Sequence, residues 1–364
     1  MQSSMRVGYL IDVHGGPYDQ PIPSRADVVK KLDALIEEGI AAEQSGFHSI
    51  AVPDRHGRTE TYFPGPLQLL TLLARETSHA ALGTFSLIST LVHPMLVAEQ
   101  AAIIDNLSKG RFFLALARGY HEGYWDYFGV KPERLLGRHM EAVRVIKQAL
   151  LGERFTFEGD FYQVRDSVLT PQAYQEGGFP IWGAGDSVKA MLRGVEYGEA
   201  WPASPFPIFR PAWEERLAAY REKCDALGKQ PYVVLMRDGW VANSFEEAAE
   251  SFGRHYAEEM LFYQRQGILQ QVHPFFDSPE KITVDTMRGH AIMGTPSQCI
   301  EQLEELRENL GVDYVMMRFR MPTGPSFEAA RDQIYQFGAD VVSPIHAKYP
   351  EPPNHPAIPE GSRW

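Results

Sequence analysis

Cysteine and long apolar runs are the features that this 364-residue chain has least of. Its two cysteines, Cys224 and Cys299, lie far apart, so they can form neither a disulfide framework nor a cysteine-based zinc site. No run of about 18 apolar residues occurs, and the first residues lack the basic and apolar segments of a signal peptide. We therefore expect a cytoplasmic protein without a membrane span.

Positive charge is also scarce. The chain has 35 lysines and arginines against 47 aspartates and glutamates, which gives a net charge of −12. An acidic surface repels phosphate backbones and anionic lipids, so we expect no binding to nucleic acids or membranes. A few arginines could still form a local pocket for one small anion.

Short apolar runs alternate with amphipathic stretches about eight times along the chain. Strands are expected at 6–13, 49–53, 81–88, 111–117, 180–184, 199–203, 232–242 and 312–318. The stretches between them have apolar residues at helical spacing, as at 26–44 and 134–150. This order predicts an α/β protein, a closed (β/α)8 TIM barrel. An open doubly wound sheet is the alternative, but residues 12–17 after the first strand lack its dinucleotide-binding fingerprint.

We expect one barrel domain over residues 1–348. Insertions at about 153–170 and 267–290 interrupt the repeat and are expected on the rim of the barrel, the first as a small strand pair. Residues 349–364 are rich in proline and are expected to form an extended or disordered tail.

Candidate site residues follow the strands, because the active sites of such barrels lie at the carboxyl ends of the strands. Gly183-Ala184-Gly185-Asp186-Ser187 joins a strand to a helix, and its glycines and helix N-terminus suit a small phosphate group. An ordinary capped turn would have the same sequence. Arg118 follows another strand and could bind a phosphate or form a salt bridge at the rim. Arg134 and Arg138 oppose the dipole of the helix that they begin, which favours a separate anionic partner for them.

Other strand-end residues allow several interpretations. His56 follows the second strand and is a candidate catalytic residue, whereas most other histidines need no functional explanation. Asp12 with His14, and Asp54 with His56, resemble pairs of metal ligands, but the later strands offer no matching set, so we expect no metal site. No G-x-S-x-G motif supports a serine triad. The aromatic segment that begins at Tyr120 is either an apolar wall for a flat ligand or a local cluster.

An ordered set of motifs resembles the bacterial luciferase-like flavin monooxygenases. The motifs run in order over about residues 5–345. They are Gly83-Thr84-Phe85-Ser86, His93-Pro94, Glu99, the segment 105–112, Arg118-Gly119, the strand end 181–185, Gly294-Thr295-Pro296 and the Asp54-Arg55-His56 turn. The resemblance implies a (β/α)8 barrel that takes reduced FMN from a separate flavin reductase, adds O2 at the flavin C4a position and oxidises a small organic substrate. It also implies a homodimer.

The resemblance assigns roles to individual residues. Arg118, with Arg134 or Arg138, matches basic residues near the flavin phosphate, and Gly185, Asp186 and Ser187 match the phosphate-binding loop. Ser86 matches a residue beside the flavin ring that follows a non-proline cis peptide in relatives, so we predict a cis Phe85–Ser86 bond. His14 and Tyr120 are expected to line the substrate pocket.

One departure from the family pattern concerns catalysis. The luciferase branch has Glu-His-His where this chain has Asp54-Arg55-His56, so its proposed acid/base aligns with Arg55. We expect either that His56 takes over the acid/base role one position later or that no acid/base is needed there, with Arg55 also in the catalytic site. Two alternatives stay open, namely an F420-dependent oxidoreductase that transfers hydride and a flavin-binding partner subunit without catalysis.

Overall fold

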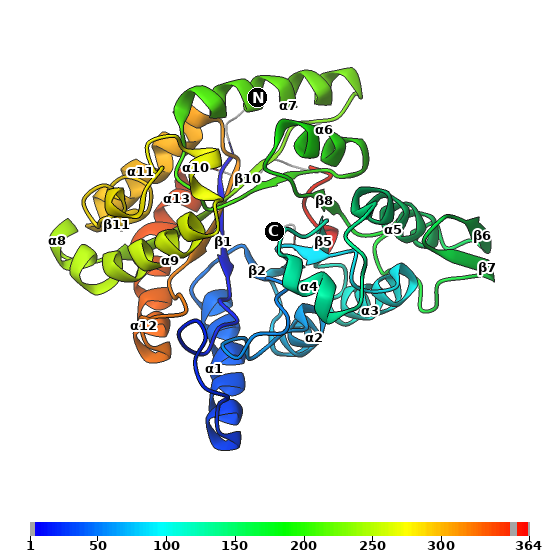
Figure 1. Ribbon diagram of the computed structural model, residues 1–364, viewed down its shortest axis with the longest axis horizontal. Helices are drawn as coiled ribbons and strands as arrows, with labels where there is room; N and C mark the ends of the chain where they lie inside the picture. Colours follow the sequence, from blue (N-terminus) through cyan, green and yellow to red (C-terminus); the bar gives the residue numbers. More distant parts are fainter. Residues whose placement is uncertain (1–3, 350–354, 363–364) are drawn as a thin grey trace.

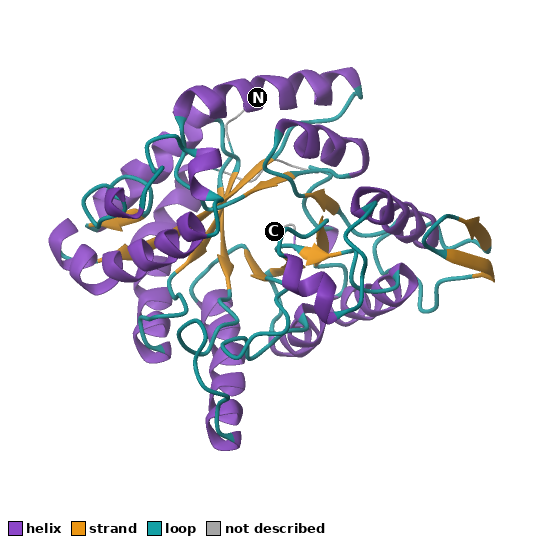
Figure 2. Ribbon diagram, in the orientation of Figure 1, coloured by secondary structure: helices purple, strands orange, loops and turns teal. Residues whose placement is uncertain are grey.

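Eight parallel strands form a curled sheet whose two ends meet (Figures 1 and 2). The computed structural model describes residues 4–349 and 355–362. In spatial order the strands are β8 (Ile181–Gly183), β5 (Phe112–Ala117), β3 (Ala81–Thr84), β2 (Ser49–Val52), β1 (Arg6–Leu10), β12 (Tyr314–Arg318), β10 (Val233–Val241) and β9 (Trp201–Ala203). Hydrogen bonds from Glu199 N to Ile181 O (2.7 Å) and from Gly183 N to Ala200 O (3.1 Å) connect the two ends. The predicted (β/α)8 barrel is confirmed.

Helices surround this sheet (Figure 2). They are α1 (Arg25–Gln44), α2 (Pro66–Glu76), α3 (Pro94–Ser108), α5 (Leu135–Leu150), α6 (Val188–Tyr197), α7 (Arg210–Ala226), α8 (Phe245–Ala248), α9 (Arg254–Arg265), α11 (Pro296–Leu310), α12 (Phe327–Phe337) and α13 (Ser343–Lys348). Local sequence fixes where several of them begin. The side chains of Ser24, Ser187 and Thr295 accept hydrogen bonds from backbone N–H groups of the first turn. Every helix in the described residues is too short or too polar to span a bilayer.

The inside of the barrel is filled by aromatic residues and by the end of the chain. Phe113 stacks on Trp182 with ring centroids 4.0 Å apart, and the Trp182 Nε1–H donates to Ala357 O over 2.9 Å. Ala357 and Ile358 are buried in this core, beside the end of the barrel where the strands begin. The tail therefore packs over residues 355–362 rather than extending away. Pro350, Pro352 and Pro353 of the expected tail lie outside the described residues.

Three local features differ from the expected strands and loops. The strand expected at 81–88 is split into β3 and β4 (Leu87–Ile88) at a cis Phe85–Ser86 peptide bond, which confirms the predicted bond. Gly294 was expected to follow no strand, but β11 (Ile292–Gly294) precedes α11 and pairs with the far end of β10. The aromatic segment after β5, where no helix was expected, contains the short helix α4 (Glu122–Tyr127).

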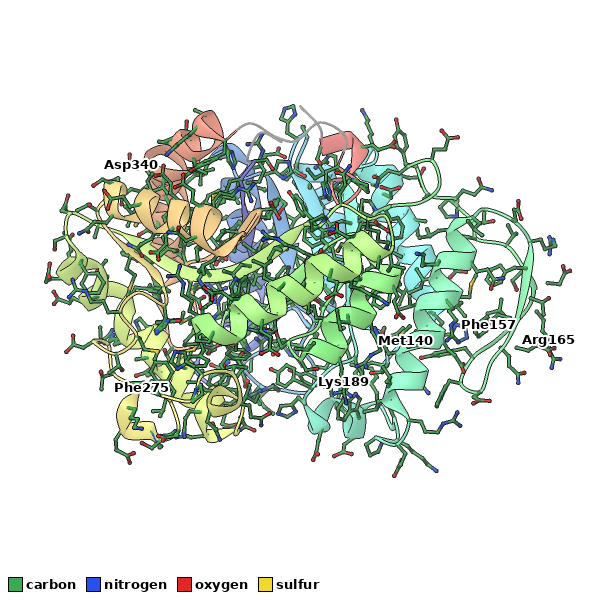
Figure 3. The ribbon with its side chains drawn as sticks, turned by 90° about the horizontal axis from the view of Figure 1, so that it is seen from above. Met140, Phe157, Arg165, Lys189, Phe275 and Asp340 are labelled. Carbon is green, nitrogen blue, oxygen red and sulfur yellow. The ribbon has the colours of Figure 1, made fainter. Side chains whose placement is uncertain are left out.

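The two expected insertions lie at opposite ends of the molecule. Residues 153–170 contain the antiparallel pair β6 (Phe155–Glu158) and β7 (Gln163–Ser167), which follows α5 and projects at one side (Figure 3, near Phe157 and Arg165). Residues 267–290 contain α10 (Leu269–Val272) and carry Phe275 at the other side. Lys189 of α6 and Phe275 lie toward the same edge in Figure 3, and Asp340 lies toward the opposite edge.

Candidate functional site

A cavity of about 820 Å³ opens where the strands end. Residues that follow six of the eight barrel strands line it, together with parts of α5, α6, α9 and the segment around α10. Seven of the sequence-predicted site residues are among them: Arg55, Ser86, Arg118, Tyr120, Gly185, Asp186 and Ser187. The structure therefore brings most of the predicted flavin residues to one place.

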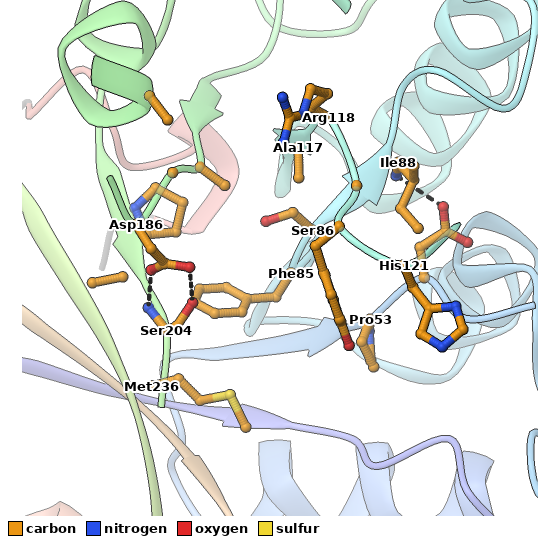
Figure 4. A pocket seen from close by; sticks show the side chains of 18 of the residues that line it. Pro53, Phe85, Ser86, Ile88, Ala117, Arg118, His121, Asp186, Ser204 and Met236 are labelled. Atoms are coloured by element: carbon orange, nitrogen blue, oxygen red, sulfur yellow. Dashed lines mark hydrogen bonds between the residues drawn. The ribbon is translucent and has the colours of Figure 1, made fainter. Parts of the chain in front are cut away.

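The turn between β8 and α6 forms one end of the cavity. Ser187 caps α6, and its hydroxyl accepts from Ala190 N (3.3 Å). The Asp186 carboxylate accepts from the Ser204 hydroxyl (2.6 Å) and backbone N–H (3.3 Å), as the dashed lines in Figure 4 show. This turn thus offers a helix N-terminus beside a carboxylate that is already engaged.

Close packing places the second half of α6 against β8. A Cβ atom at Gly183 would lie 2.5 Å from the Cα atom of Gly194, so the strand and the helix meet backbone to backbone. Only glycine allows such an approach at both positions without displacing the helix. These two glycines therefore set the distance between α6 and the barrel mouth.

Positive charge gathers at the same end of the cavity. Arg118 and Arg193 line the cavity, and no carboxylate oxygen of residues 4–349 and 355–362 forms an ion pair with either guanidinium. His139 lies beside them, with its ring nitrogens 2.6 Å from Ser89 Oγ and 3.1 Å from the Tyr197 hydroxyl. Burial, together with the charges of Arg118 and Arg193, lowers the pKa of His139 to about 4. The imidazole is therefore neutral at pH 7 and adds no charge to the two arginines that line this end.

The cis Phe85–Ser86 segment forms the middle of the cavity wall. In Figure 4, Ser86 lies between Asp186 on one side and His121 on the other. Asp54 accepts a hydrogen bond from Ile88 N (2.9 Å), which ties the end of β2 to β4. Phe85, Ile88 and Met236 add apolar surface here, as a flat ring system requires.

A third part of the lining consists of one arginine and several tyrosines. The Arg55 Nη2 atom donates to the Tyr263 hydroxyl over 3.3 Å. Tyr120 and Tyr124 approach from the β5–α4 segment and from α4, and Tyr263 belongs to α9. Tyr124 and Tyr263 are buried, whereas Tyr120 is half exposed.

A buried ion cluster supports the lining near the carboxyl end of β12. The Arg318 guanidinium contacts Asp238 Oδ1 (2.6 Å), Asp12 Oδ2 (3.1 Å) and Glu259 Oε1 (3.5 Å). Burial would raise the pKa of Asp12, but His14 and Arg318 outweigh it and hold that pKa well below its ordinary value. Burial raises the pKa of Asp238 despite the same arginine. The three carboxyl groups of this cluster therefore outnumber its two basic groups, Arg318 and His14, and all five side chains are buried.

Four predicted site residues do not line the cavity. His14 is fully buried with Nδ1 2.5 Å from Asp12 Oδ1, and His56 Nε2 lies 2.6 Å from Asp54 Oδ1. Arg134 pairs with the exposed Asp160, and Arg138 Nε donates to Thr90 O over 2.8 Å. These four side chains therefore lie outside the lining of the cavity.

The sequence reasoning missed His139, Arg193 and Tyr197. His139 was among the histidines that needed no functional explanation, although it is the immediate neighbour of Arg138 on α5. In α6, Ala190, Arg193 and Tyr197 are spaced by three and four residues and all line the cavity. Helical spacing counted from Ser187 would have found the last two, because such positions share one helix face.

This lining fits a flavin nucleotide. Two arginines without acidic partners and a capped helix N-terminus suit a phosphate group. The wall around Phe85 and Ser86 suits a planar ring. Among the described residues, no group of three or more histidine, cysteine, aspartate and glutamate side chains has an arrangement that could hold a metal ion.

Comparisons with known proteins agree with this fit. The sequence model of the family described as luciferase-like monooxygenase matches residues 5–314. The oxygenase component of a flavin-dependent trigonelline monooxygenase from Acinetobacter baylyi is 26% identical over 331 residues, which cover 85% of this chain and 89% of that protein. An F420-dependent glucose-6-phosphate dehydrogenase from Kineococcus radiotolerans is 30% identical over 228 residues, 60% of this chain and 66% of that protein. The oxygenating constituent of 3,6-diketocamphane monooxygenase from Pseudomonas putida, solved in complex with FMN, has the same fold, with a TM-score of 0.76, 15% identity and coverage of 93% and 98%.

Proposed function

Since the chain belongs to the luciferase-like monooxygenase family, we propose that it is the oxygenase of a two-component flavin-dependent monooxygenase that uses reduced FMN and O2 to oxidise a small organic substrate. The observation that carries the proposal is that one cavity has both an end that suits a phosphate group and an apolar wall that suits a flavin ring. Arg118, Arg193 and the capped start of α6 form that end, and Phe85 and Ser86 form the wall.

The chain's own residues would bind and orient the cofactor. Arg118, Arg193 and the N–H groups at Ser187 hold the phosphate, and the neutral His139, whose ring nitrogens contact Ser89 and Tyr197, adds no further charge. Ser86 and its neighbours support the ring. Reduced FMN, when bound, supplies the two electrons that activate oxygen. The tyrosines around Arg55 keep water away from that reaction.

F420-dependent hydride transfer is the second candidate, because the dehydrogenase from Kineococcus radiotolerans that resembles this chain uses F420. Both cofactors carry a phosphate next to the ribityl chain, so the phosphate end alone does not separate them. The larger tail of F420 needs an open path beyond that phosphate. A protein that binds a flavin without turnover is the remaining alternative.

Anaerobic titration of the purified protein with reduced FMN and with reduced F420 distinguishes these functions. We expect tighter binding of reduced FMN, and a change in the absorbance spectrum of the bound flavin on the stopped-flow timescale when oxygen is added. Tight binding of F420 without binding of FMN would overturn the proposal in favour of hydride transfer. Binding of FMN with unchanged oxygen reactivity across a panel of organic substrates would favour the non-catalytic alternative.

The proposal extends to partners. We propose that a separate flavin reductase supplies reduced FMN, that both proteins act in the cytoplasm and that the chain forms a homodimer. The relative from Acinetobacter baylyi is named as an oxygenase component, which supports the proposal that the oxygenase and the reductase are separate proteins. Sedimentation analysis of the purified protein, alone and with a flavin reductase, tests the dimer and whether the reductase contact is transient.

A further inference from the structure

Arg55 lines the cavity without an acidic partner among the described residues. Its guanidinium donates to the Tyr263 hydroxyl over 3.3 Å. Within residues 4–349 and 355–362, no carboxylate oxygen lies within ion-pair distance of it. The nearby Arg58 differs, because it pairs with the buried Glu60. Arginine stays protonated in proteins, so Arg55 places an unbalanced positive charge in the cavity wall.

A buried tyrosine hydroxyl lies beside this charge. Tyr124 is only 2% exposed and lines the cavity, and its hydroxyl makes no well-formed hydrogen bond with a described residue. It is nevertheless close enough to Arg55 for the two groups to interact electrostatically. Burial raises the pKa of Tyr124, so the hydroxyl keeps its proton at pH 7 and can donate it in a hydrogen bond. An unmade hydrogen bond of this kind costs stability unless a ligand completes it.

Aromatic surface surrounds the two donors. Tyr120 and Tyr263 line the same region, and the ring of Phe206 packs edge-on against Tyr263 with centroids 5.1 Å apart. The positive potential reaches the neighbouring His121, whose pKa is lowered by burial and by the charges of Arg58 and Arg55. A ligand for this region must therefore combine negative charge with a flat or apolar body.

This region is separate from the phosphate end. The phosphate end is formed by Arg118, Arg193 and the start of α6, none of which is an interaction partner of Arg55. Figure 4 shows Ser86 between Asp186 and His121, which belong to the two regions. A bound flavin whose phosphate lies at α6 would still leave Arg55 without a counter-charge.

We propose that Arg55 and Tyr124 bind the carboxylate of the organic substrate, and that the substrate is an aromatic or similarly flat carboxylic acid whose body packs against Tyr120, Tyr263 and Phe206. The planar guanidinium matches a carboxylate with two parallel hydrogen bonds, and the tyrosine hydroxyl supplies a third donor. A neutral substrate that displaced water here would leave the cation desolvated, which is unfavourable. Arg55 is thus a specificity-determining residue. The inference rests on the proposed function, which makes this cavity the substrate site.

Calorimetric titration with benzoate and with its neutral analogue benzamide, each up to tens of millimolar, tests the proposal. Wild-type protein, with and without bound FMN, should bind benzoate at least about tenfold more tightly than benzamide. Arg55→Met should weaken benzoate binding by about 10- to 100-fold and leave benzamide binding nearly unchanged. Arg55→Lys should lie between these values, because it keeps the charge but loses the planar fork.

Two further variants make the result independent of folding defects and of the flavin proposal. Tyr124→Phe removes no well-formed intramolecular hydrogen bond and should weaken benzoate binding by about 3- to 10-fold. Arg193→Gln, at the phosphate end, should leave benzoate binding unchanged and weaken FMN binding. Equal affinities of the wild type for benzoate and benzamide, or equal loss of benzoate binding in the Arg55 and Arg193 variants, would overturn the inference. If the wild-type protein does not bind FMN, the proposed function is refuted instead.

Discussion

Replacing Arg318 with methionine is expected to lower the free energy of unfolding by about 3–5 kcal/mol at pH 7, because buried carboxylates lose their counter-charge. The guanidinium contacts Asp12, Asp238 and Glu259, and all four side chains are at most 3% exposed. Methionine fills a similar volume without charge, so the change isolates the electrostatic contribution.

The size of the effect follows from protonation. Asp12 keeps His14 as a partner, and Glu259 still accepts from the Tyr18 hydroxyl over 2.6 Å. Asp238 has the raised pKa and is the carboxyl that should take up a proton when Arg318 is gone. Holding one carboxyl protonated at pH 7 against an unfolded pKa of about 3.9 costs about 4 kcal/mol, at about 1.4 kcal/mol per pH unit. This cost sets the expected loss.

The direction in which the stability of the variant changes with pH follows from the protonation of Asp238. In the variant the folded state binds one more proton than the unfolded state above about pH 4, so its stability falls as pH rises. The deficit relative to the wild type should therefore shrink from about 4 kcal/mol at pH 7 to about 1.5 kcal/mol at pH 5. Urea denaturation at both pH values, followed by tryptophan fluorescence, measures it.

The control is Arg331→Met, which removes a pair with Glu37 in which the side chains are 40% and 55% exposed. It should cost less than about 1 kcal/mol and show no comparable pH dependence. A loss below 1 kcal/mol for Arg318→Met, or a deficit that stays constant between pH 5 and pH 7, would refute the inference that Asp238 takes up a proton when Arg318 is removed.

Four other changes test the site and the core. Arg193→Gln should weaken FMN binding about tenfold or more, measured by fluorescence titration, with a smaller salt dependence than the wild type; unchanged affinity would remove Arg193 from the phosphate site. Burial and the neighbouring arginines lower the pKa of His139 to about 4. Between about pH 6.5 and pH 4 the unfolded state therefore binds more protons than the folded state, so the free energy of unfolding decreases as the pH falls. His139→Gln should abolish up to about 3 kcal/mol of that acid loss in denaturation curves; an unchanged slope would contradict the assignment. Gly183→Ala should cost about 1–3 kcal/mol and weaken FMN binding together, and a loss of stability with normal FMN binding would show that α6 does not depend on this contact. Ile358→Asn should lower the melting temperature by several degrees, and an unchanged melting temperature would contradict its place in the barrel core.

The sequence predicted the barrel because its strands and helices alternate with distinct periodicities. It also predicted the phosphate turn, since Gly185 and Ser187 combine close approach with a helix cap. It could not separate Arg138 from His139, because one residue along α5 turns the side chain by about 100° and only packing decides which one faces the cavity. β11 was not predicted because a strand of three residues is too short to show a periodic pattern in the sequence.

The contacts of Arg55 were equally invisible from sequence. Tyr263 stands 208 positions away along the chain. Nothing local in either residue indicates the other, because their approach depends on how α9 lies across the barrel mouth. The match to a catalytic histidine of the family suggested catalysis for Arg55, whereas its surroundings favour recognition of an anion.

The position of residues 355–362 has a consequence for how the protein is made. Chains fold from the N-terminus as they leave the ribosome. These residues emerge after every barrel strand, yet Ala357 and Ile358 cover Trp182 and Tyr232 inside the barrel. Until then Trp182 and Tyr232 lack the contribution of Ala357 and Ile358 to their packing. We therefore expect the barrel core to be complete only after residues 355–362 have been synthesised.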